Sequence, residues 1–302
     1  MKTKVTIVEV GLRDGLQNEK FQLTTEQKVQ FAHKLIDAGI ERIELGAFVR
    51  PDWIPQMAGS KDVIDQVLQA TTPKTNKKIQ AAALVPNERG MQDALETKIK
   101  EIAIFAAASE SFSKKNINCT IEESFERFVP VMKLAKKNKI KVRGYLSTCF
   151  GCPYEGNVPE KKVVELAKRL YKMGCYEISI GDTIGVASPA QVESLFKKLK
   201  KVIPVKKLAG HFHDTRGTAL ANIYAAYKLG VRVFDTSLGG LGGCPYAPGS
   251  AGNVATEDVV YMFDQMKIKT GIDLKKLIKT NTWVSTLMGK ELPSRVSKAE
   301  RN

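Results

Sequence analysis

The sequence predicts a closed (β/α)8 barrel, the fold known as a TIM barrel. Eight short apolar runs of strand length follow one another along the chain, and amphipathic segments with helical periodicity lie between most of them. Several helical segments end at a glycine, which is typical of helix C-termini. Repeated strand–helix units imply parallel strands joined by right-handed crossovers, and eight such units need about 250 residues.

The predicted strands are rich in valine, isoleucine and other apolar residues, and each is bounded by polar or turn-forming positions. They cover residues 5–10, 42–46, 79–84, 101–105, 141–147, 177–180, 208–212 and 231–236.

The predicted helices have recognisable start signals. Thr24 and Gln27 have the spacing of a capping box, in which each side chain bonds the backbone N–H of the other residue. Pro189 follows Ser188 and suits the first helical position. The helical segments are residues 24–38, 121–136, 159–173, 189–201 and 217–229, with extra helix at 272–287.

An open, doubly wound sheet is the competing fold. That fold usually has fewer strands and a glycine-rich phosphate-binding turn near the first strand, and the segment 11–15, Gly-Leu-Arg-Asp-Gly, is not such a fingerprint. We therefore expect one domain over residues 1–302, with the barrel at about 4–265 and a C-terminal helical extension at about 266–302.

Composition is that of an ordinary globular protein, with 43% hydrophobic and 26% charged residues. No signal peptide, transit peptide or apolar run of membrane-spanning length is visible, so we expect a cytoplasmic protein that binds no membrane.

An odd and scattered set of cysteines predicts free thiols, at Cys119, Cys149, Cys152, Cys175 and Cys244.

The net charge is +15, and lysines cluster at residues 136–139, 197–201 and 206–207. Solvated helix faces are the favoured explanation. No recognition module or aromatic-interleaved basic stripe accompanies the lysines, so we expect no nucleic-acid partner. The positive field would also attract a phosphate-bearing coenzyme.

Polar residues gather at the C-terminal ends of the predicted strands, where barrel enzymes place their catalytic groups. They are Arg13, Asp14, Glu44, Ser109, Glu110, Arg143, Tyr145, Ser179, Asp182, His211, His213, Cys244 and Asn253.

His211 and His213 stand at positions i and i+2 of a strand and therefore share one face. Barrel closure brings Asp14 beside them, and Asn253 can add a carbonyl oxygen. These ligands suit Mg²⁺, Mn²⁺ or Fe²⁺ better than a structural Zn²⁺ site. The alternatives are a pair of hydrogen-bonded core histidines and, for Asp14, a turn residue.

Two Gly-Cys-Pro-Tyr segments occur, at residues 151–154 and 243–246. The pair Cys149 and Cys152 is expected to be packed thiols, because no second Cys pair completes a zinc site. The second copy is surrounded by glycines, which predicts a loop that closes over substrate and delivers a proton from Cys244. A rigid turn with a buried cysteine is the alternative.

Five segments together resemble the 3-hydroxy-3-methylglutaryl-CoA lyase family, within a superfamily that also contains isopropylmalate and homocitrate synthases. They are VEVGLRDGLQNEK (8–20), KKNINC (114–119), GCPYEG (151–156), GDTIG (181–185) and GGLGGCPYAPGSAGN (239–253). The resemblance spans nearly the whole chain. One departure is Arg50, in a segment where the family often has serine.

The resemblance implies an acyl-CoA substrate, a homodimer and a role of the leucine-degradation type. It implies a divalent cation, Mg²⁺ or Mn²⁺, held by Asp14, His211, His213 and Asn253. Arg13 would stabilise the enolate of acetyl-CoA, while Cys244 or His211 would transfer a proton. Further active-site positions implied by the resemblance are Glu44, Asp182, Lys20, Ser109, Tyr145 and Ser179.

Three other functions stay open at this point. A condensing enzyme would join acetyl-CoA to a 2-oxo acid on the same barrel. A lyase for a longer-branched 3-hydroxyglutaryl-CoA would share the chemistry. A basic nucleic-acid-binding barrel would leave the polar residues at the strand ends unexplained.

Overall fold

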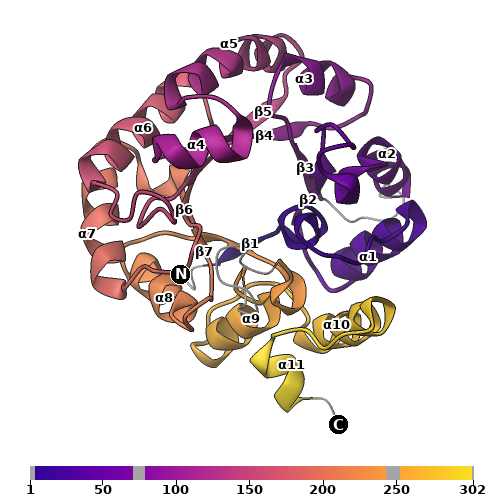
Figure 1. The fold of residues 1–302 in the computed structure, drawn as a ribbon. Coiled ribbons are helices and arrows are strands. Elements are labelled where there is room, and N and C mark those ends of the chain that lie inside the picture. The colour runs from indigo at the N-terminus through magenta and orange to yellow at the C-terminus, as the bar shows by residue number, and fades with distance from the viewer. Residues whose placement is uncertain (1–3, 71–78, 243–251, 301–302) are drawn as a thin grey trace.

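The computed structural model describes residues 4–70, 79–242 and 252–300. Within them, eight parallel strands close into a barrel in chain order, which confirms the predicted (β/α)8 fold (Figure 1). The strands are β1 (Thr6–Glu9), β2 (Arg42–Ala47), β3 (Gln80–Leu84), β4 (Glu101–Ala107), β5 (Lys141–Ser147), β6 (Glu177–Asp182), β7 (Leu208–Phe212) and β8 (Val233–Thr236).

Helices surround the barrel as a ring. They are α1 (Thr25–Asp37), α2 (Ser60–Ala70), α3 (Glu88–Leu95), α4 (Glu110–Ile117), α5 (Ile121–Lys137), α6 (Glu160–Met173), α7 (Pro189–Leu199), α8 (Ala219–Lys228), α9 (Thr256–Gln265), α10 (Leu274–Met288) and α11 (Arg295–Ala299). In the described part of the chain, no helix is long and apolar enough to cross a membrane.

The predicted helix starts are confirmed at α1 and α7. Thr24 and Gln27 form the complete capping box, and so do Ser188 and Gln191, with Pro189 at the first position of α7. We did not predict α2, α3, α4, α9 and α11. Helices α3 and α4 have 8 residues each, which is too short for a clear 3.6-residue periodicity.

A layer of paired charges fills part of the barrel interior. Arg143 Nε lies 2.7 Å from Glu177 Oε1, Arg143 Nη2 lies 2.8 Å from Asp235 Oδ1, and Arg42 Nη2 lies 3.0 Å from Glu177 Oε1. Arg143 is 1% exposed. Our placement of Arg143 among the residues of the barrel mouth is therefore wrong, because its side chain is held inside by two carboxylates.

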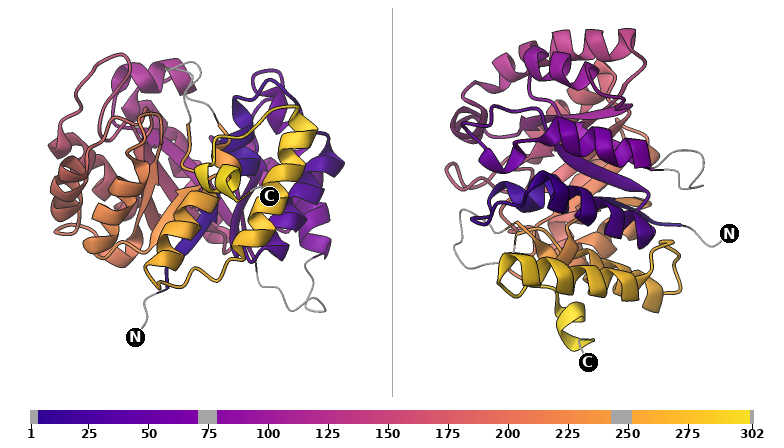
Figure 2. Two further views of the ribbon diagram at one scale, coloured as in Figure 1. Left: turned by 90° about the horizontal axis from the view of Figure 1, so that it is seen from below. Right: turned by 90° about the vertical axis from the view of Figure 1, so that its right-hand side faces the viewer.

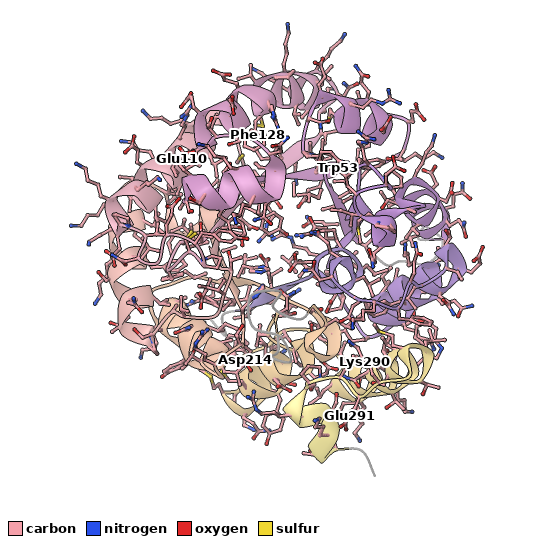
Figure 3. All side chains as sticks on the ribbon, in the orientation of Figure 1. Trp53, Glu110, Phe128, Asp214, Lys290 and Glu291 are labelled. Atoms are coloured by element: carbon pink, nitrogen blue, oxygen red, sulfur yellow. The ribbon has the colours of Figure 1, made fainter. Side chains whose placement is uncertain are left out.

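The C-terminal extension packs along the side of the barrel, against α1 and α9 (Figure 2). Ion pairs connect the extension to the barrel: Lys290 Nζ lies 2.5 Å from Glu19 Oε2, and Arg295 Nη1 lies 2.8 Å from Asp214 Oδ2. Figure 3 labels one residue of each pair, Lys290 and Asp214. The extension therefore supports the segments that follow β1 and β7.

The short turn after β8 depends on Gly239. Its φ is +64°, and a Cβ there would lie 2.4 Å from Leu292 Cδ1 and 2.7 Å from Asn281 Nδ2. Gly289, after α10, has a similar φ of +61° with nothing within 4 Å of a Cβ.

We expect Gly239→Ala to lower the free energy of unfolding by about 1–3 kcal/mol more than Gly289→Ala does. The reason is that only the new methyl group at position 239 would overlap neighbouring side chains. Both variants share the left-handed backbone cost of about 1–2 kcal/mol. Urea titrations of the two proteins measure the difference. Equal losses would show that the turn tolerates a side chain.

Candidate active site

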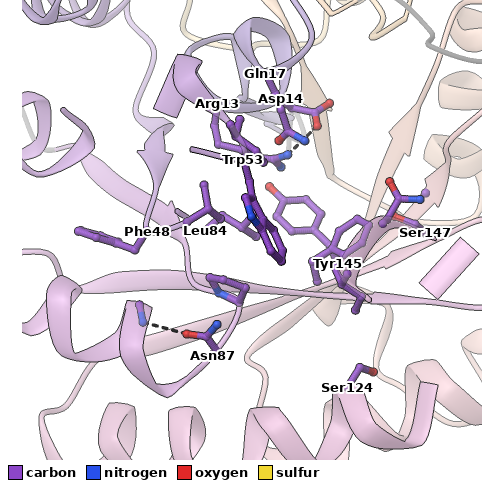
Figure 4. Close-up of a pocket in the computed structure, with 18 of the residues that line it drawn as sticks. Arg13, Asp14, Gln17, Phe48, Trp53, Leu84, Asn87, Ser124, Tyr145 and Ser147 are labelled. Atoms are coloured by element: carbon purple, nitrogen blue, oxygen red, sulfur yellow. Dashed lines mark hydrogen bonds and ion pairs between the residues drawn. The ribbon is translucent and has the colours of Figure 1, made fainter. Parts of the chain in front are cut away.

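A cavity of about 780 Å³ opens at the C-terminal mouth of the barrel. Residues that follow β1, β2, β3 and β7 line it, together with side chains of β5 and β6. Figure 4 labels several of them, including Arg13, Phe48 and Tyr145. Its lining includes Arg13, Asp14, Tyr145, Ser179, His211, His213 and Asn253 from our predicted site. The barrel thus brings these seven residues to a single cavity.

A π-helical turn, η1 (Gly11–Gly15), presents Arg13 and Asp14 to this cavity. The Gly15 N–H donates to Val10 O at 3.1 Å, which is the i→i+5 bond of a π-turn. The Gly11 N–H donates to Glu9 Oε1 at 2.8 Å and secures the start of the turn. Single π-turns of this kind are common at functional sites, because they redirect side chains.

Asp14, His211 and His213 each place one potential ligand atom within 4.8 Å of the other two. His211 Nε2 lies 3.9 Å from Asp14 Oδ2, and the two imidazole centroids are 5.3 Å apart. A carboxylate and two imidazoles at this spacing form a candidate divalent-cation site. The shared strand face that we predicted for the two histidines is consistent with this grouping.

The hydrogen bonding and the protonation states of these side chains suit the binding of a cation. Among the described residues, the buried His213 Nδ1 has no hydrogen-bond partner. Burial and the neighbouring His211 lower the pKa of His213 to about 4, so its imidazole is neutral. Burial alone would raise the pKa of Asp14, but Arg13 and His211 lower it to about 2. Asp14 and His213 are therefore in the protonation states that bind metals.

Asn253 reaches the cluster from the segment after β8. Its Nδ2 donates to Asp14 Oδ2 at 2.8 Å and to Leu241 O at 3.3 Å. A half-turn of the amide would present its oxygen to a cation instead. The backbone supports this position, because His213 and Asn253 form an antiparallel bridge.

Asp235 orients His211 from below. Its Oδ2 lies 3.3 Å from His211 Nδ1 and accepts from Ser179 Oγ at 2.6 Å, while its Oδ1 accepts from Arg143. A carboxylate on Nδ1 holds the proton there and leaves Nε2 as the ligand atom. Burial would lower the pKa of His211, but the bond to Asp235 and the charge of Asp14 raise it above its usual value.

Arg13 lies between two carboxylates and an aromatic ring. Its Nε lies 2.6 Å from Glu44 Oε2 and its Nη1 lies 2.6 Å from Asp14 Oδ1. The guanidinium carbon is 5.4 Å from the centroid of the Tyr145 ring. This clamp fixes a buried positive charge directly beside the candidate cation site.

Other predicted site residues lie outside the cavity lining. Ser109 caps α4 and lies 2.9 Å from Cys152 Sγ. The Asp182 carboxylate accepts from the Val186 and Ala187 N–H groups at 3.0 Å, so it organises the loop before α7. Lys20 is exposed.

Cys244 lies outside the described residues. The cysteines that the structure describes are free thiols and buried, as predicted for Cys149 and Cys152.

Sequence reasoning missed Glu9 and Asp235. Glu9 is fully buried and accepts from Gly11 N, Leu238 N at 2.9 Å and Thr256 Oγ1 at 2.5 Å. It therefore connects the π-turn to the segment after β8. The sequence did contain a signal: each carboxylate stands in an otherwise apolar strand. A carboxylate in such a buried position is rare unless it has charged or hydrogen-bonding partners.

The fold and the cluster define the class of protein: a (β/α)8-barrel enzyme with a candidate divalent-cation site at its mouth. The HMGL-like family matches residues 4–284, and the chain belongs to this family.

Similar proteins cover nearly the whole chain. The 3-hydroxy-3-isohexenylglutaryl-CoA/hydroxymethylglutaryl-CoA lyase of Pseudomonas aeruginosa is 48% identical over 98% of this chain and 97% of its own length. The hydroxymethylglutaryl-CoA lyase of Bacillus subtilis is 49% identical over 97% and 96%. The crystal structure of the B. subtilis HMG-CoA lyase has a TM-score of 0.95, with 48% identity over 99% of both chains.

A further solved structure contains ligands. It is an HMG-CoA lyase from Acinetobacter baumannii in complex with coenzyme A and 3-methylmalate. Its TM-score is 0.92, with 37% identity, and the match covers 99% of this chain and 96% of that one.

We expect Asp235→Asn to weaken Mn²⁺ binding about 10–100-fold, because an amide no longer holds the proton on His211 Nδ1. Electron paramagnetic resonance titration of free Mn²⁺ measures this, at a temperature where circular dichroism shows the variant folded. Asp62→Asn, on the exposed face of α2, is the matched control. Unchanged affinity in folded Asp235→Asn would rule out the orienting role.

Burial raises the pKa of Glu9 to about 7 despite its hydrogen bonds. The folded chain therefore keeps a proton that the unfolded chain loses above about pH 4.5, and stability falls as pH rises from about 4.5 to 7. Glu9→Gln removes this dependence. We expect the variant to gain up to about 3 kcal/mol relative to wild type between about pH 5 and pH 8.

Urea titrations at the two pH values measure this gain, with the exposed Glu126→Gln as the control for the substitution itself. A difference between Glu9→Gln and wild type that does not change with pH would contradict the buried titration.

Proposed function

We propose that this chain is a 3-hydroxy-3-methylglutaryl-CoA lyase, which cleaves the (S)-thioester to acetyl-CoA and acetoacetate. The observation that carries the proposal is the Asp14, His211 and His213 cluster beside the clamped Arg13. It lies in a chain about half identical, over nearly its full length, to hydroxymethylglutaryl-CoA lyases. The similarity to lyases argues against the condensing-enzyme alternative.

The residues that would hold the cation are Asp14, His211, His213 and Asn253. A bound Mg²⁺ or Mn²⁺ supplies Lewis-acid polarisation of the substrate hydroxyl and acyl oxygens. Both ions accept mixed imidazole and oxygen ligands, which supports them over metals that prefer thiolates.

In the reaction, the C2–C3 bond breaks as the tertiary hydroxyl loses its proton. C3 becomes the ketone carbon of acetoacetate, and the electron pair passes to C2 and the thioester oxygen as the enolate of acetyl-CoA. Arg13 places a positive charge where this oxyanion develops. Its pairing with Glu44 and Asp14 holds the guanidinium in position before substrate arrives.

The reaction includes two proton transfers. Asp14 is one candidate for the base that removes the hydroxyl proton, because its carboxylate is ionised and lines the cavity. Cys244 is our proposed acid for the enolate carbon. His211 is the alternative, but the cation and the proton would compete for its Nε2, since Nδ1 bonds Asp235.

Several expectations from the sequence and from the resemblance stay proposals. They are catalytic or binding roles for Glu44, Asp182, Lys20, Ser109, Tyr145 and Ser179, a single domain over residues 1–302, a homodimer, a cytoplasmic location and a leucine-degradation role. Of these residues, Tyr145 and Ser179 line the cavity, and Glu44 contacts Arg13, which supports them most directly.

The decisive experiment is incubation with 3-hydroxy-3-methylglutaryl-CoA and Mg²⁺, followed by an assay for acetoacetate. We expect stoichiometric acetoacetate and acetyl-CoA, with loss of turnover after chelation and recovery on adding Mg²⁺ or Mn²⁺. Absence of acetoacetate from folded, metal-loaded protein would overturn the proposed function.

We expect Arg13→Gln to lower kcat at least about 100-fold, because the developing oxyanion loses its cationic partner. Steady-state assays measure the effect, and Arg169→Gln, on the outer surface of α6, is the matched control. Near-full turnover by Arg13→Gln would exclude the enolate-stabilising role.

A further inference from the structure

The lysine clusters of the sequence gather at one end of the barrel. The connections that precede β4, β5, β6, β7 and β8 belong to the N-terminal end, opposite the cavity mouth. Five segments form or flank them and contain no Asp or Glu: residues 97–100, 134–141, 170–176, 199–207 and 226–232. We call their lysines the basic end: Lys98, Lys100, Lys136, Lys137, Lys139, Lys141, Lys172, Lys200, Lys201, Lys206, Lys207 and Lys228. All are exposed except the half-buried Lys207.

Contacts between neighbouring connections join the basic end into one surface. The Lys141 N–H donates to Lys100 O at 3.0 Å, which joins the connections before β5 and β4. Lys141 Nζ lies 5.9 Å from the centroid of the Tyr176 ring, just before β6. Lys200 Nζ donates to Leu229 O at 2.7 Å and joins the connections before β7 and β8. The lysines therefore face solvent together at this end of the barrel.

Carboxylates do little to neutralise the basic end. Within residues 4–70, 79–242 and 252–300, none of its lysines lies within ion-pair distance of an acidic side chain. Glu101 and Glu177, which begin β4 and β6, are buried and paired with Arg42. The exposed Glu41, before β2, pairs with Lys4. Much of the net charge of +15 is therefore presented at this end.

The cavity at the mouth does not use these lysines. No lysine lines it, and arginines at its rim have acidic partners of their own. Arg50 Nη2 lies 3.3 Å from Asp52 Oδ2, and Arg89 Nε lies 3.4 Å from Asp93 Oδ1. The 7 residues of β5 place about 20 Å between the two ends. That distance exceeds the Debye length of about 8 Å, so attraction of a coenzyme to the mouth does not explain the basic end.

We propose that the basic end binds the surface of an anionic lipid bilayer, with the cavity mouth facing the solution. Each lysine close to such a surface strengthens binding about fivefold, so a few suffice for adsorption. We expected no membrane partner because the sequence has no apolar span. Adsorption by charge needs no span, so that observation does not oppose the proposal.

A bilayer surface fits the basic end better than a nucleic-acid strand does. The lysines come from five connections arranged around the barrel axis, so many of them can approach a plane at once. Proteins that bind single strands commonly stack bases on aromatic side chains. The exposed aromatic residues in the described part of the chain lie on other segments: Phe21, Trp53, Tyr154, Tyr224 and Tyr261. Lysine also lacks the planar fork with which arginine recognises phosphates.

The test is co-sedimentation with vesicles of phosphatidylcholine that contain about one-third phosphatidylglycerol, at about 0.15 M salt. We expect wild type to bind these vesicles, to ignore pure phosphatidylcholine, and to bind at least about tenfold more weakly at 0.5 M salt. The triple variant Lys100→Gln, Lys201→Gln, Lys206→Gln should lower the binding constant at least about 30-fold. Failure of wild type to bind the anionic vesicles would overturn the proposal.

The matched control is the triple variant Lys114→Gln, Lys161→Gln, Lys168→Gln, at exposed positions of α4 and α6. It removes the same number of positive charges and should bind within about threefold of wild type. Equal losses in the two triple variants would show that net charge alone matters, and would overturn the basic end as the docking surface. Circular dichroism verifies that both variants are folded.

The orientation has its own test. Trp53 lies at the cavity mouth and is 67% exposed (Figure 4). The chain has 2 tryptophans, so Trp53 alone reports in a Trp283→Phe variant. A quencher on the lipid headgroups should leave its fluorescence unchanged, because the mouth faces away from the bilayer. Quenching of Trp53 in bound protein would contradict the proposed orientation.

Duplex RNA, added at the same salt concentration, tests the rival partner. We expect it to bind more weakly than the anionic vesicles, and tighter binding to RNA would overturn the bilayer as the partner. None of these measurements uses the thioester, so their failure and failure of the proposed function are distinguishable.

Discussion

The Asp235 carboxylate connects the interior of the barrel to the candidate active site. Inside a protein, an ionised carboxylate is stable only when charged or hydrogen-bonding groups surround it. Asp235 has three: Arg143 from the buried ion layer, Ser179 from β6 and His211 from β7. The orientation of a candidate metal ligand therefore depends on a charge network that lies below the cavity floor.

Barrel closure supplies the second constraint. β1 pairs with β8, where Glu9 is in register with Thr236, and β7 pairs with β8, where His211 is in register with Asp235. These two pairings bring the turn that carries Asp14 to the histidines. Glu9 then joins the same turn to Leu238 and Thr256, so the first and last parts of the barrel hold one site.

Much of the fold was predictable because it depends on local signals. Strands with continuous apolar runs and helices with capping boxes, such as α1 and α7, were found close to their true bounds. The 8-residue helices α3 and α4 were missed, because so few residues give no clear period. The polar side of the cavity was also anticipated, since His211, His213 and Asp14 stand at or just beyond strand ends. The phenylalanines that line the cavity, Phe48, Phe105 and Phe112, were not anticipated, because they have no signal beyond that of ordinary core residues.

The sequence by itself determined the barrel, the candidate cation ligands and the family. Each follows from strand periodicity or from a short motif, in which neighbouring positions carry the information. Only the tertiary structure decided that Arg143 lies inside the barrel, that Asp182 holds a loop, and that Asp235 and Glu9 support the site. The physical reason is that a charged side chain takes its role from the partners that surround it. Those partners come from strands far apart in the chain and meet only when the barrel closes.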